Sequence, residues 1–566
     1  MGYDEKKQID EVEKESSSVG QDSGDGDSLH DPDQHHGLHR GLKARQISMI
    51  ALGGAIGTGL IIGSGTALRR GGPLGMLRML SSILFNVHFL AVGLFLGYSF
   101  VGFVCYLVMI ALGEMAAFLP HKKGFAGYAT RFVDPALGFA LGWNYLMKYL
   151  IVTPNNINAA GVVVQYWTRS VHIAIWMVFL VNLLGIRVFG ELEFWFSALK
   201  VISLTGLILM GIIIDLGGNP KHDRIGFRYW DAPYGPMGTY LLSQVHNEHL
   251  SIFLGFWATL TNALFAFIGT ELIGVTVGEA QNPRKNIPIA IRRTFWRILV
   301  FYIGGVFVIG LTVPSTNQSL FIATQSKTGA AASPFVVAAS LAGIKVLNHV
   351  INAAILIFVI SAANSDLYIG SRTLYGLAVE GKAPAIFRRV NRLGVPYPAL
   401  FLCTAFCALV FLNVKSSGAK VFGWFVNLVS TFGAITWMLI LYSHISFMKA
   451  LKAHGMSRDD LPYKAPFQPW GSWFALGSTL IITIFKGFDS FLPFNTANFI
   501  TNYIALPVVF FIWVSYKIIM RTKVIPPEDV DLVTGIREID DEETKFLAEE
   551  AAKGPRTRVA RIWDSL

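Results

Sequence analysis

The sequence predicts an all-α membrane protein with twelve transmembrane helices, arranged as a 5+5 inverted repeat in which helices 1 and 6 are broken. Three observations predict this fold class. Hydrophobic residues make up 53% of the 566 residues and charged residues only 15%, so the chain is far more apolar than a soluble domain. Apolar runs of bilayer-spanning length follow one another along it. Two of these runs, five spans apart, carry matching interruptions that contain glycine.

Three regions differ in composition. Residues 1–43 are polar and lack hydrophobic periodicity, which predicts a disordered tail. Residues 44–520 contain the apolar runs. Residues 521–566 are charged, and the stretch EIDDEETKFLAEE favours a short solvated helix. The three cysteines stand in apolar stretches without metal-ligand spacing, so neither a metal site nor a cofactor is predicted.

A helix needs about 20 residues to cross about 30 Å of hydrocarbon. The runs that meet or approach this length cover residues 47–68, 94–118, 136–167, 171–188, 194–217, 252–278, 296–314, 346–370, 397–413, 421–447, 471–486 and 497–520.

The distribution of basic residues predicts the orientation of these spans. PHKKGFAGYATR, NPRKNIPIAIRR, GKAPAIFRRVNR, MKALKAHGMSR and KIIMRTK all fall on one side of the twelve-span arrangement. Because basic loops face the cytoplasm, both termini are predicted to be cytoplasmic. The net charge of +10 is scattered over these short loops rather than gathered in one patch, which argues against nucleic-acid binding.

The first span contains GGAIGTGLIIGSG (53–65) and the sixth contains FAFIGTELIG (265–274). Paired interruptions in corresponding spans are typical of transporters whose two halves meet at a site near the bilayer midplane. Freed main-chain N–H groups in the first span would hold a carboxylate, and freed carbonyls in the sixth would accept from an ammonium, so the predicted ligand is an α-amino acid. The positions concerned are Ala55, Ile56, Gly57, Thr58 and Gly59, then Phe267, Ile268, Gly269 and Thr270. The alternative is close helix packing through small residues, at Gly53/Gly57 and Gly59/Gly63.

Longer motifs make the chain resemble a known family. GGAIGTGLIIGSGTAL, GEMAAFLP, YATRFVDPALGFALGWNY, GTELIGVTVGEAQNPRKNIPIAI and SAANSDLYIGSRTLYGLAVEGKAP resemble the fungal amino acid permeases of the amino acid–polyamine–organocation superfamily, over residues 40 to 530. LMKYLIVTPNNINAAGVVVQYW, GNPKHDRIGFRYW and SAANSDLY look most like the members that import dicarboxylic amino acids. The resemblance implies a plasma-membrane importer driven by inward proton movement.

Lys148 gives a physical reason for a preference for acidic substrates. It stands 14 positions from Asp134 and 19 from Trp167, which places it about 20 Å or more from either end of the third span. Permeases of this family usually carry Pro-x-Glu nearby, whereas this chain has Asn156 in the place of the acid. An intramembrane lysine indicates function by default, and we expect it to bind the substrate's side-chain carboxylate with Asn155 as helper. The alternative partner is an acid of the protein or main-chain carbonyls.

Two residues are candidates for proton coupling. Lys200 resembles a lysine that couples protons in some superfamily members, but it lies close enough to its span end to reach the headgroups instead. Glu271 follows the interruption of the sixth span and is placed to relay a proton, line the site or stabilise the break. Asp366, in the eighth span, sits where the fold faces its central cavity, and a bond to a neighbouring helix is the alternative.

One segment departs from the family pattern. Residues 76–93 (MLRMLSSILFNVHFLAVG) intervene where family members run from the GGPLG turn into the second span. A thirteenth span here would invert the later loops and contradict their charges. We therefore hypothesise that these residues derive from a retained intron, which sequencing of the transcript would test.

These observations together predict a proton-coupled plasma-membrane importer of amino acids, with L-glutamate and L-aspartate as substrates. A broad or neutral amino acid permease and a membrane nutrient sensor are the alternatives. No constellation of nucleophile and base is present, so the chain is not expected to be an enzyme. By the same resemblance, a ubiquitin ligase is a partner of the N-terminal tail at Lys6, Lys7 and Lys14.

Overall fold

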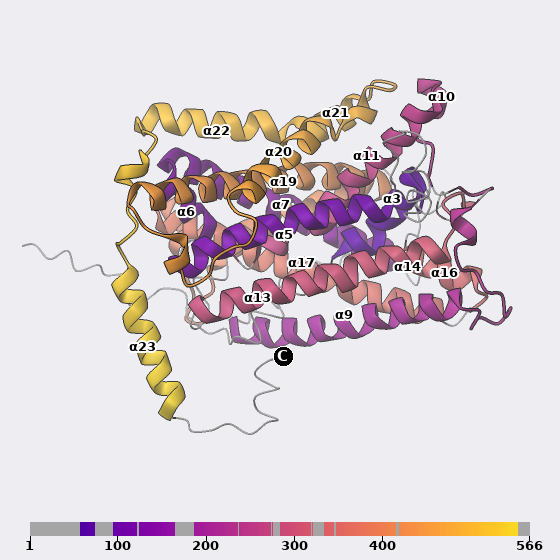
Figure 1. The fold of residues 1–566 in the computed structure, drawn as a ribbon, viewed down its shortest axis with the longest axis horizontal. Coiled ribbons are helices and arrows are strands. Elements are labelled where there is room, and N and C mark those ends of the chain that lie inside the picture. Colours follow the sequence, from indigo (N-terminus) through magenta and orange to yellow (C-terminus); the bar gives the residue numbers. More distant parts are fainter. Residues whose placement is uncertain are drawn as a thin grey trace, which may run out of the picture. The chain divides into compact units, whose positions relative to one another are not determined.

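The computed structural model describes residues 57–73, 94–120, 124–164, 186–231, 233–235, 237–272, 274, 283–318, 320, 333–344, 347–414 and 418–552. All of them belong to one compact unit, His39–Leu566. They are helical and contain no β-strand beyond one isolated bridge between Phe491 and Phe494. The expected all-α class is therefore confirmed for the described residues (Figure 1).

The α-helices, labelled in part in Figure 1, are α3 (Ser64–Gly71), α5 (Leu94–Phe118), α6 (Gly124–Phe132), α7 (Pro135–Val164), α9 (Ile186–Asp215), α10 (Leu242–Val245), α11 (Glu248–Phe267), α13 (Pro283–Arg297), α14 (Gly304–Thr312), α16 (Pro334–Leu341), α17 (Leu347–Val379), α18 (Tyr397–Phe406), α19 (Gly418–Ala453), α20 (Trp470–Phe485), α21 (Thr496–Tyr503), α22 (Ala505–Met520) and α23 (Ile536–Ala552). Shorter π and 3-10 segments are η1 (Gly59–Gly63), η2 (Arg228–Trp230), η3 (Thr270–Leu272), η5 (Ile298–Ile303), η7 (Ala385–Arg388), η8 (Cys407–Val414), η9 (Arg458–Asp460), η10 (Phe488–Ser490) and η11 (Pro527–Asp529).

Eight stretches of the described chain are long and apolar enough to cross a membrane. They are Leu94–Phe118, Gly190–Asp215, Glu248–Leu272, Arg284–Thr312, Leu347–Val379, Lys420–Ala453, Trp470–Ser490 and Thr496–Met520. The third predicted span is present as α7, a helix of 30 residues, and the ninth as the shorter helix Tyr397–Leu412. Ten of the 22 residues of the first predicted span and 15 of the 18 residues of the fourth lie outside the described residues, so the count of twelve stays a prediction.

Several helices extend beyond the apolar runs that predicted them. The basic stretch NPRKNIPIAIRR was expected to be a loop, but α13 begins at Pro283 and continues through η5 into α14. That expectation was wrong because Arg and Lys end an apolar run without ending a helix, since both residues have good helix propensity. The helix predicted within EIDDEETKFLAEE is present as α23.

α7 is the central helix of the described bundle. It makes its most extensive contacts with α17 and α19, and it also meets α6, α18 and α22. Polar side chains along it bond across to these neighbours, which is how buried polar groups are satisfied at membrane depth. The Asn144 amide, for example, donates to the Phe432 carbonyl at 2.9 Å and to the Thr436 hydroxyl at 2.8 Å on α19.

The predicted interruption of the sixth span is confirmed. α11 ends at Phe267, Ile268 is extended with ψ of 136°, and Gly269 has φ of +104°, a region that favours glycine. The π segment η1 packs directly on this stretch, because a Cβ on Gly59 would lie 3.0 Å from the Ala266 nitrogen. The two glycine-containing segments therefore touch, and Gly59 serves the close packing that was the alternative interpretation. Residues 53–56 lie outside the described part of the chain.

The chain after α22 lies against the ends of other helices. The Ile525 N–H donates to the Val133 carbonyl at 2.8 Å, and Val530 and Leu532 are buried. Two arginines, Arg131 of α6 and Arg284 of α13, contact Asp531, Thr534, Asp540 and Glu543.

The Asp531 carboxylate keeps its charge in this arrangement. Burial raises its pKa, but hydrogen bonds from Thr534 and Val533 and the charge of Arg131 outweigh burial and lower it to about 2. The contact with Arg131 is therefore present throughout the physiological pH range.

The flanks of residues 76–93 predict the effect of removing that segment. The Leu94 N–H donates to the Gly72 carbonyl at 3.1 Å. If Gly75 were joined to Leu94, these two groups would stand at positions i+4 and i, which is the spacing of the α-helical hydrogen bond. Pro73 would then occupy the first turn of α5, where its missing N–H costs nothing.

We therefore expect the chain lacking residues 76–93 to fold with a melting temperature equal to or above that of the full chain. Thermal unfolding of both purified forms measures this. As a control, deleting 18 residues that begin at Leu94 would remove most of α5 and should abolish folding. A shortened chain without a melting transition would contradict the expectation.

Candidate functional site

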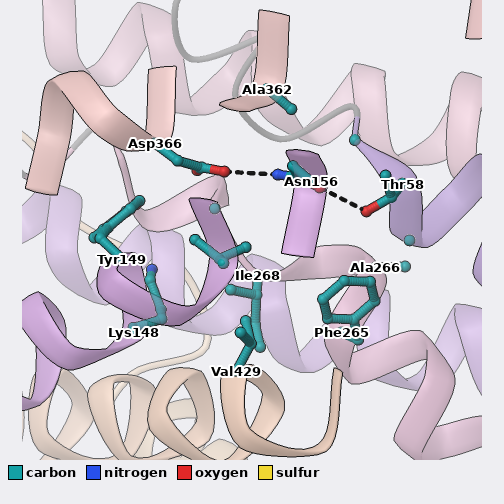
Figure 2. A pocket seen from close by; sticks show the side chains of 14 residues that line it. Thr58, Lys148, Tyr149, Asn156, Phe265, Ala266, Ile268, Ala362, Asp366 and Val429 are labelled. Carbon is teal, nitrogen blue, oxygen red and sulfur yellow. Dashed lines mark hydrogen bonds between the residues drawn. The ribbon is translucent and has the colours of Figure 1, made fainter. Parts of the chain in front are cut away.

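A cavity lies where η1, the break after α11, α7, α17 and α19 meet (Figure 2). Its lining residues are Gly57, Thr58, Gly59, Lys148, Tyr149, Val152, Asn156, Phe265, Ala266, Ile268, Gly269, Ala362, Asp366 and Val429. Gly57 and Gly59 of the first span and Gly269 at the break of the sixth span are among them. The two glycine-containing segments that the sequence singled out therefore both contribute to this cavity.

Seven of the predicted binding residues line this cavity: Gly57, Thr58, Gly59, Lys148, Asn156, Ile268 and Gly269. Three others, Asn155, Phe267 and Thr270, are not among the lining residues. Phe267 instead stacks on Tyr302 with ring centroids 4.6 Å apart. Ala55 and Ile56 lie outside the described residues.

Helix geometry explains why Asn155 is excluded. The lining positions of α7 are 148, 149, 152 and 156, which fall within an arc of about 100° around the helix axis. Asn155 falls about 20° outside that arc, on the Lys148 side. Its side chain is buried, and neither its amide nitrogen nor its amide oxygen has a hydrogen-bond partner in the described part of the chain.

Lys148 is buried between two rings and one carboxylate. Its ammonium lies 4.1 Å from the Tyr145 ring centroid and 4.4 Å from that of Tyr149, and it forms an ion pair with Glu271. Lys148 was expected to bind the substrate's side-chain carboxylate or, as the alternative, an acid of the protein. In the structure its partner is such an acid, Glu271. Cation–π contacts and the ion pair together stabilise a charge that would otherwise be costly at this depth.

Glu271 holds the break of the sixth span in place. Besides the Lys148 ammonium, its carboxylate accepts from the Gly269 N–H at 3.0 Å and from the Trp437 indole N–H at 3.2 Å. The Glu271 carboxylate thus bonds the Gly269 N–H, which the break leaves without a helical partner. Through Lys148 and Trp437 it also connects the break to α7 and α19. Stabilising the break was one of the three roles expected for Glu271.

A second polar chain crosses the cavity. The Thr58 hydroxyl donates to Asn156 Oδ1 at 2.9 Å, and Asn156 Nδ2 donates to Asp366 Oδ2 at 2.6 Å (Figure 2). Asp366 therefore lines the cavity, as expected, and also bonds Asn156 on a neighbouring helix, which was the alternative. Three elements that are distant in sequence are connected by these two bonds.

Lys200 lies on α9, outside the cavity lining. Its ammonium is fully buried, 4.0 Å from Glu193 Oε1, and the Ser361 hydroxyl donates to the same oxygen at 2.8 Å. This buried position beside Glu193 differs from the headgroup position that was the alternative.

Sequence reasoning missed the apolar part of the lining. Tyr149, Val152, Phe265, Ala362 and Val429 line the cavity, but an apolar residue that faces a cavity has the same pattern as one that packs in a core. Glu193 was also missed, although a carboxylate seven positions before Lys200 on the same helical face was a usable signal.

Comparison with known proteins places this architecture in a family. Residues 46–525 match the amino acid permease family. The chain belongs to that family. The permease is 46% identical over 521 residues to the dicarboxylic amino acid permease of Saccharomyces cerevisiae, covering 90% of this chain and 82% of that protein. It is also 39% identical over 543 residues to a proline-specific permease of Emericella nidulans, covering 94% of each.

A solved structure shares the fold of this permease. It is that of the Eremococcus coleocola manganese transporter in complex with an aromatic bis-isothiourea substituted compound, with a TM-score of 0.51 and 13% identity over 84% of this chain and 94% of that chain. At this identity the likeness shows the fold alone. Family membership makes the permease a multi-pass membrane protein that moves amino acids, not an enzyme.

Proposed function

We propose that this permease is a proton-coupled plasma-membrane importer of acidic amino acids, glutamate and aspartate, with both termini in the cytoplasm. Lys148 is the residue on which the proposal rests, because it places a buried ammonium in the wall of a cavity that Gly57 and Gly59 of the first span and Gly269 at the break of the sixth span also line. An ammonium has three donors, so a substrate carboxylate can bond to it while Glu271 stays in place. Identity of 46% to a dicarboxylic amino acid permease supports the same substrate class.

The main chain would recognise the part that all amino acids share. N–H groups of Gly57, Thr58 and Gly59 hold the α-carboxylate, together with those of Ala55 and Ile56. Carbonyls of Ile268 and Gly269 accept from the α-ammonium. The side-chain carboxylate then points toward Lys148 and Asn156. Transport follows when one group of helices rocks against the other around this site.

Titratable groups beside the cavity would supply the proton coupling. Lys148 with Glu271 and Lys200 with Glu193 are two buried ion pairs. A buried pair whose partners separate during rocking can release or take up a proton, because each isolated charge is then unfavourable. Glu271 and Lys200 are the groups proposed for this step.

One observation favours a second candidate, a permease for neutral amino acids. Glu271 already balances the charge of Lys148, and much of the remaining lining is apolar. Such a site would bind a zwitterion with an apolar side chain. The chain's 39% identity to a proline-specific permease fits this candidate.

Uptake measurements separate the two candidates. Cells lacking their own amino acid permeases would express the full chain and the chain without residues 76–93, and would receive labelled glutamate, proline or lysine at external pH 5 and pH 7. We expect saturable glutamate uptake that is faster at pH 5, is inhibited by aspartate and is unaffected by excess proline. Inhibition by proline equal to that by aspartate would favour the neutral permease. A fluorescent tag and its accessibility to external protease test the plasma-membrane location and the cytoplasmic termini.

A further inference from the structure

Two carboxylates near the cavity have very different surroundings. Glu271 accepts from an ammonium, a main-chain N–H and an indole N–H. Asp366 is 7% exposed and, within the described chain, accepts from one amide donor, Asn156 Nδ2, and forms no ion pair. A carboxylate with three donors, one of them charged, is more stable as an anion in a buried site than a carboxylate with a single neutral donor.

The charged and titratable groups that face Asp366 come from three elements. Lys148, Tyr145 and Tyr149 lie on α7, Lys200 and Glu193 on α9, and Cys407 on η8, while Asp366 itself is on α17. Lys148 is paired with Glu271, and Lys200 lies beside Glu193. Each lysine is therefore balanced by its own acid, and Asp366 is the charge left without a counterpart in this group.

The charge of the substrate decides whether the unbalanced charge of Asp366 is repelled inside the cavity. A neutral amino acid adds no net charge to the cavity, but glutamate or aspartate adds one negative charge beside the Asp366 carboxylate. Like charges in a site with little water repel strongly, and the system relieves the repulsion by protonating one of them. A proton on Asp366 would restore the charge that the cavity had before the substrate entered.

We propose that Asp366 binds the proton that accompanies each acidic amino acid through this permease. The proton comes from water on the outside, forms an O–H bond with a carboxylate oxygen of Asp366, and returns to water on the inside when the substrate has left. Asn156 connects this event to the first span, because it bonds both Asp366 and Thr58. This inference rests on the proposed function. It adds Asp366 to the proton-coupling groups Glu271 and Lys200, as the site that binds the proton of each acidic substrate.

Three variants test the assignment. Asp366→Asn imitates the protonated side chain, Asp366→Glu keeps a titratable group, and Ser365→Ala is the matched control, since the Ser365 hydroxyl is buried next to Asp366 without a partner in the described chain. Two measurements with labelled glutamate are made for each variant. The first is accumulation against a glutamate gradient at external pH values from 4.5 to 7.5. The second is exchange with unlabelled glutamate loaded inside the cell.

For Asp366→Asn we expect accumulation to fall about tenfold or more and to lose its pH dependence, while exchange stays within about threefold of the original, because exchange requires no net proton movement. Asp366→Glu should keep pH-dependent accumulation, and Ser365→Ala should change neither measurement. Binding of glutamate by purified original protein in weak buffer should take up protons, and binding by Asp366→Asn should not.

Accumulation by Asp366→Asn with the original pH profile would overturn the proposal. Loss of both exchange and binding in Asp366→Asn would also overturn it, because Asp366 would then be a ligand or a structural residue. Failure of the proposed function is seen separately, in the unaltered chain, if that chain imports proline or lysine and not glutamate.

Discussion

Replacing Lys148 with glutamine is expected to abolish glutamate uptake and to lower the stability of the protein more than most single substitutions. The ammonium is buried and contacts Glu271, Tyr145 and Tyr149. Removing it leaves the Glu271 carboxylate buried without its cation, which costs about 3–5 kcal/mol. Fluorescence-detected size-exclusion chromatography after heating measures the stability, and labelled glutamate measures the uptake.

A double substitution separates the structural role of Lys148 from its proposed role in binding. Lys148→Gln together with Glu271→Gln removes both charges, so we expect most of the lost thermal stability to return. Glutamate uptake should stay absent, because the cation that binds the side-chain carboxylate is missing. The exposed Lys449 on α19 provides the control, and Lys449→Gln should behave as the original chain. Unchanged stability of Lys148→Gln alone would contradict the importance of the pair.

The second large effect is expected at Glu114, near the end of α5. Its buried carboxylate accepts from Arg458 through Nε at 2.7 Å and Nη2 at 2.8 Å, and from the Ala465 N–H at 3.1 Å. His444 lies 3.4 Å away on α19. Glu114→Ala removes the acceptor of all these donors and leaves the arginine without a counter-ion, a loss of about 3–5 kcal/mol.

We expect that loss to loosen the segment between α19 and α20, where Arg458 and Ala465 lie. Limited proteolysis would show new cleavage between residues 454 and 469 in Glu114→Ala. Asp459→Asn is the control in the same segment, because Asp459 and its partner Lys464 are mostly exposed and such a pair contributes about 0–1 kcal/mol. Equal cleavage in the two variants would show that Glu114 does not hold the segment.

Periodicity and composition predicted the elements of this fold because they depend on short stretches of chain. Apolar runs located most of the spanning helices, since every helix in hydrocarbon must be apolar over its lipid-facing length. The interruption at Gly269 was predictable for a similar reason, because glycine at that position permits a positive φ. Helix ends were less predictable, as α13 illustrates, because basic residues stop an apolar run and not a helix.

The sequence alone thus determined the helical class, the broken sixth span and the presence of a lysine at membrane depth. Only the tertiary structure decided which acid meets that lysine, since Lys148 and Glu271 are 123 positions apart and other apolar helices also contain an acid, such as Asp366 on α17. It also decided that Asn156 connects Thr58 with Asp366. Partners of this kind depend on how α7, α11 and α17 pack, and packing is set by the shapes of whole helix faces rather than by the spacing of residues within one helix.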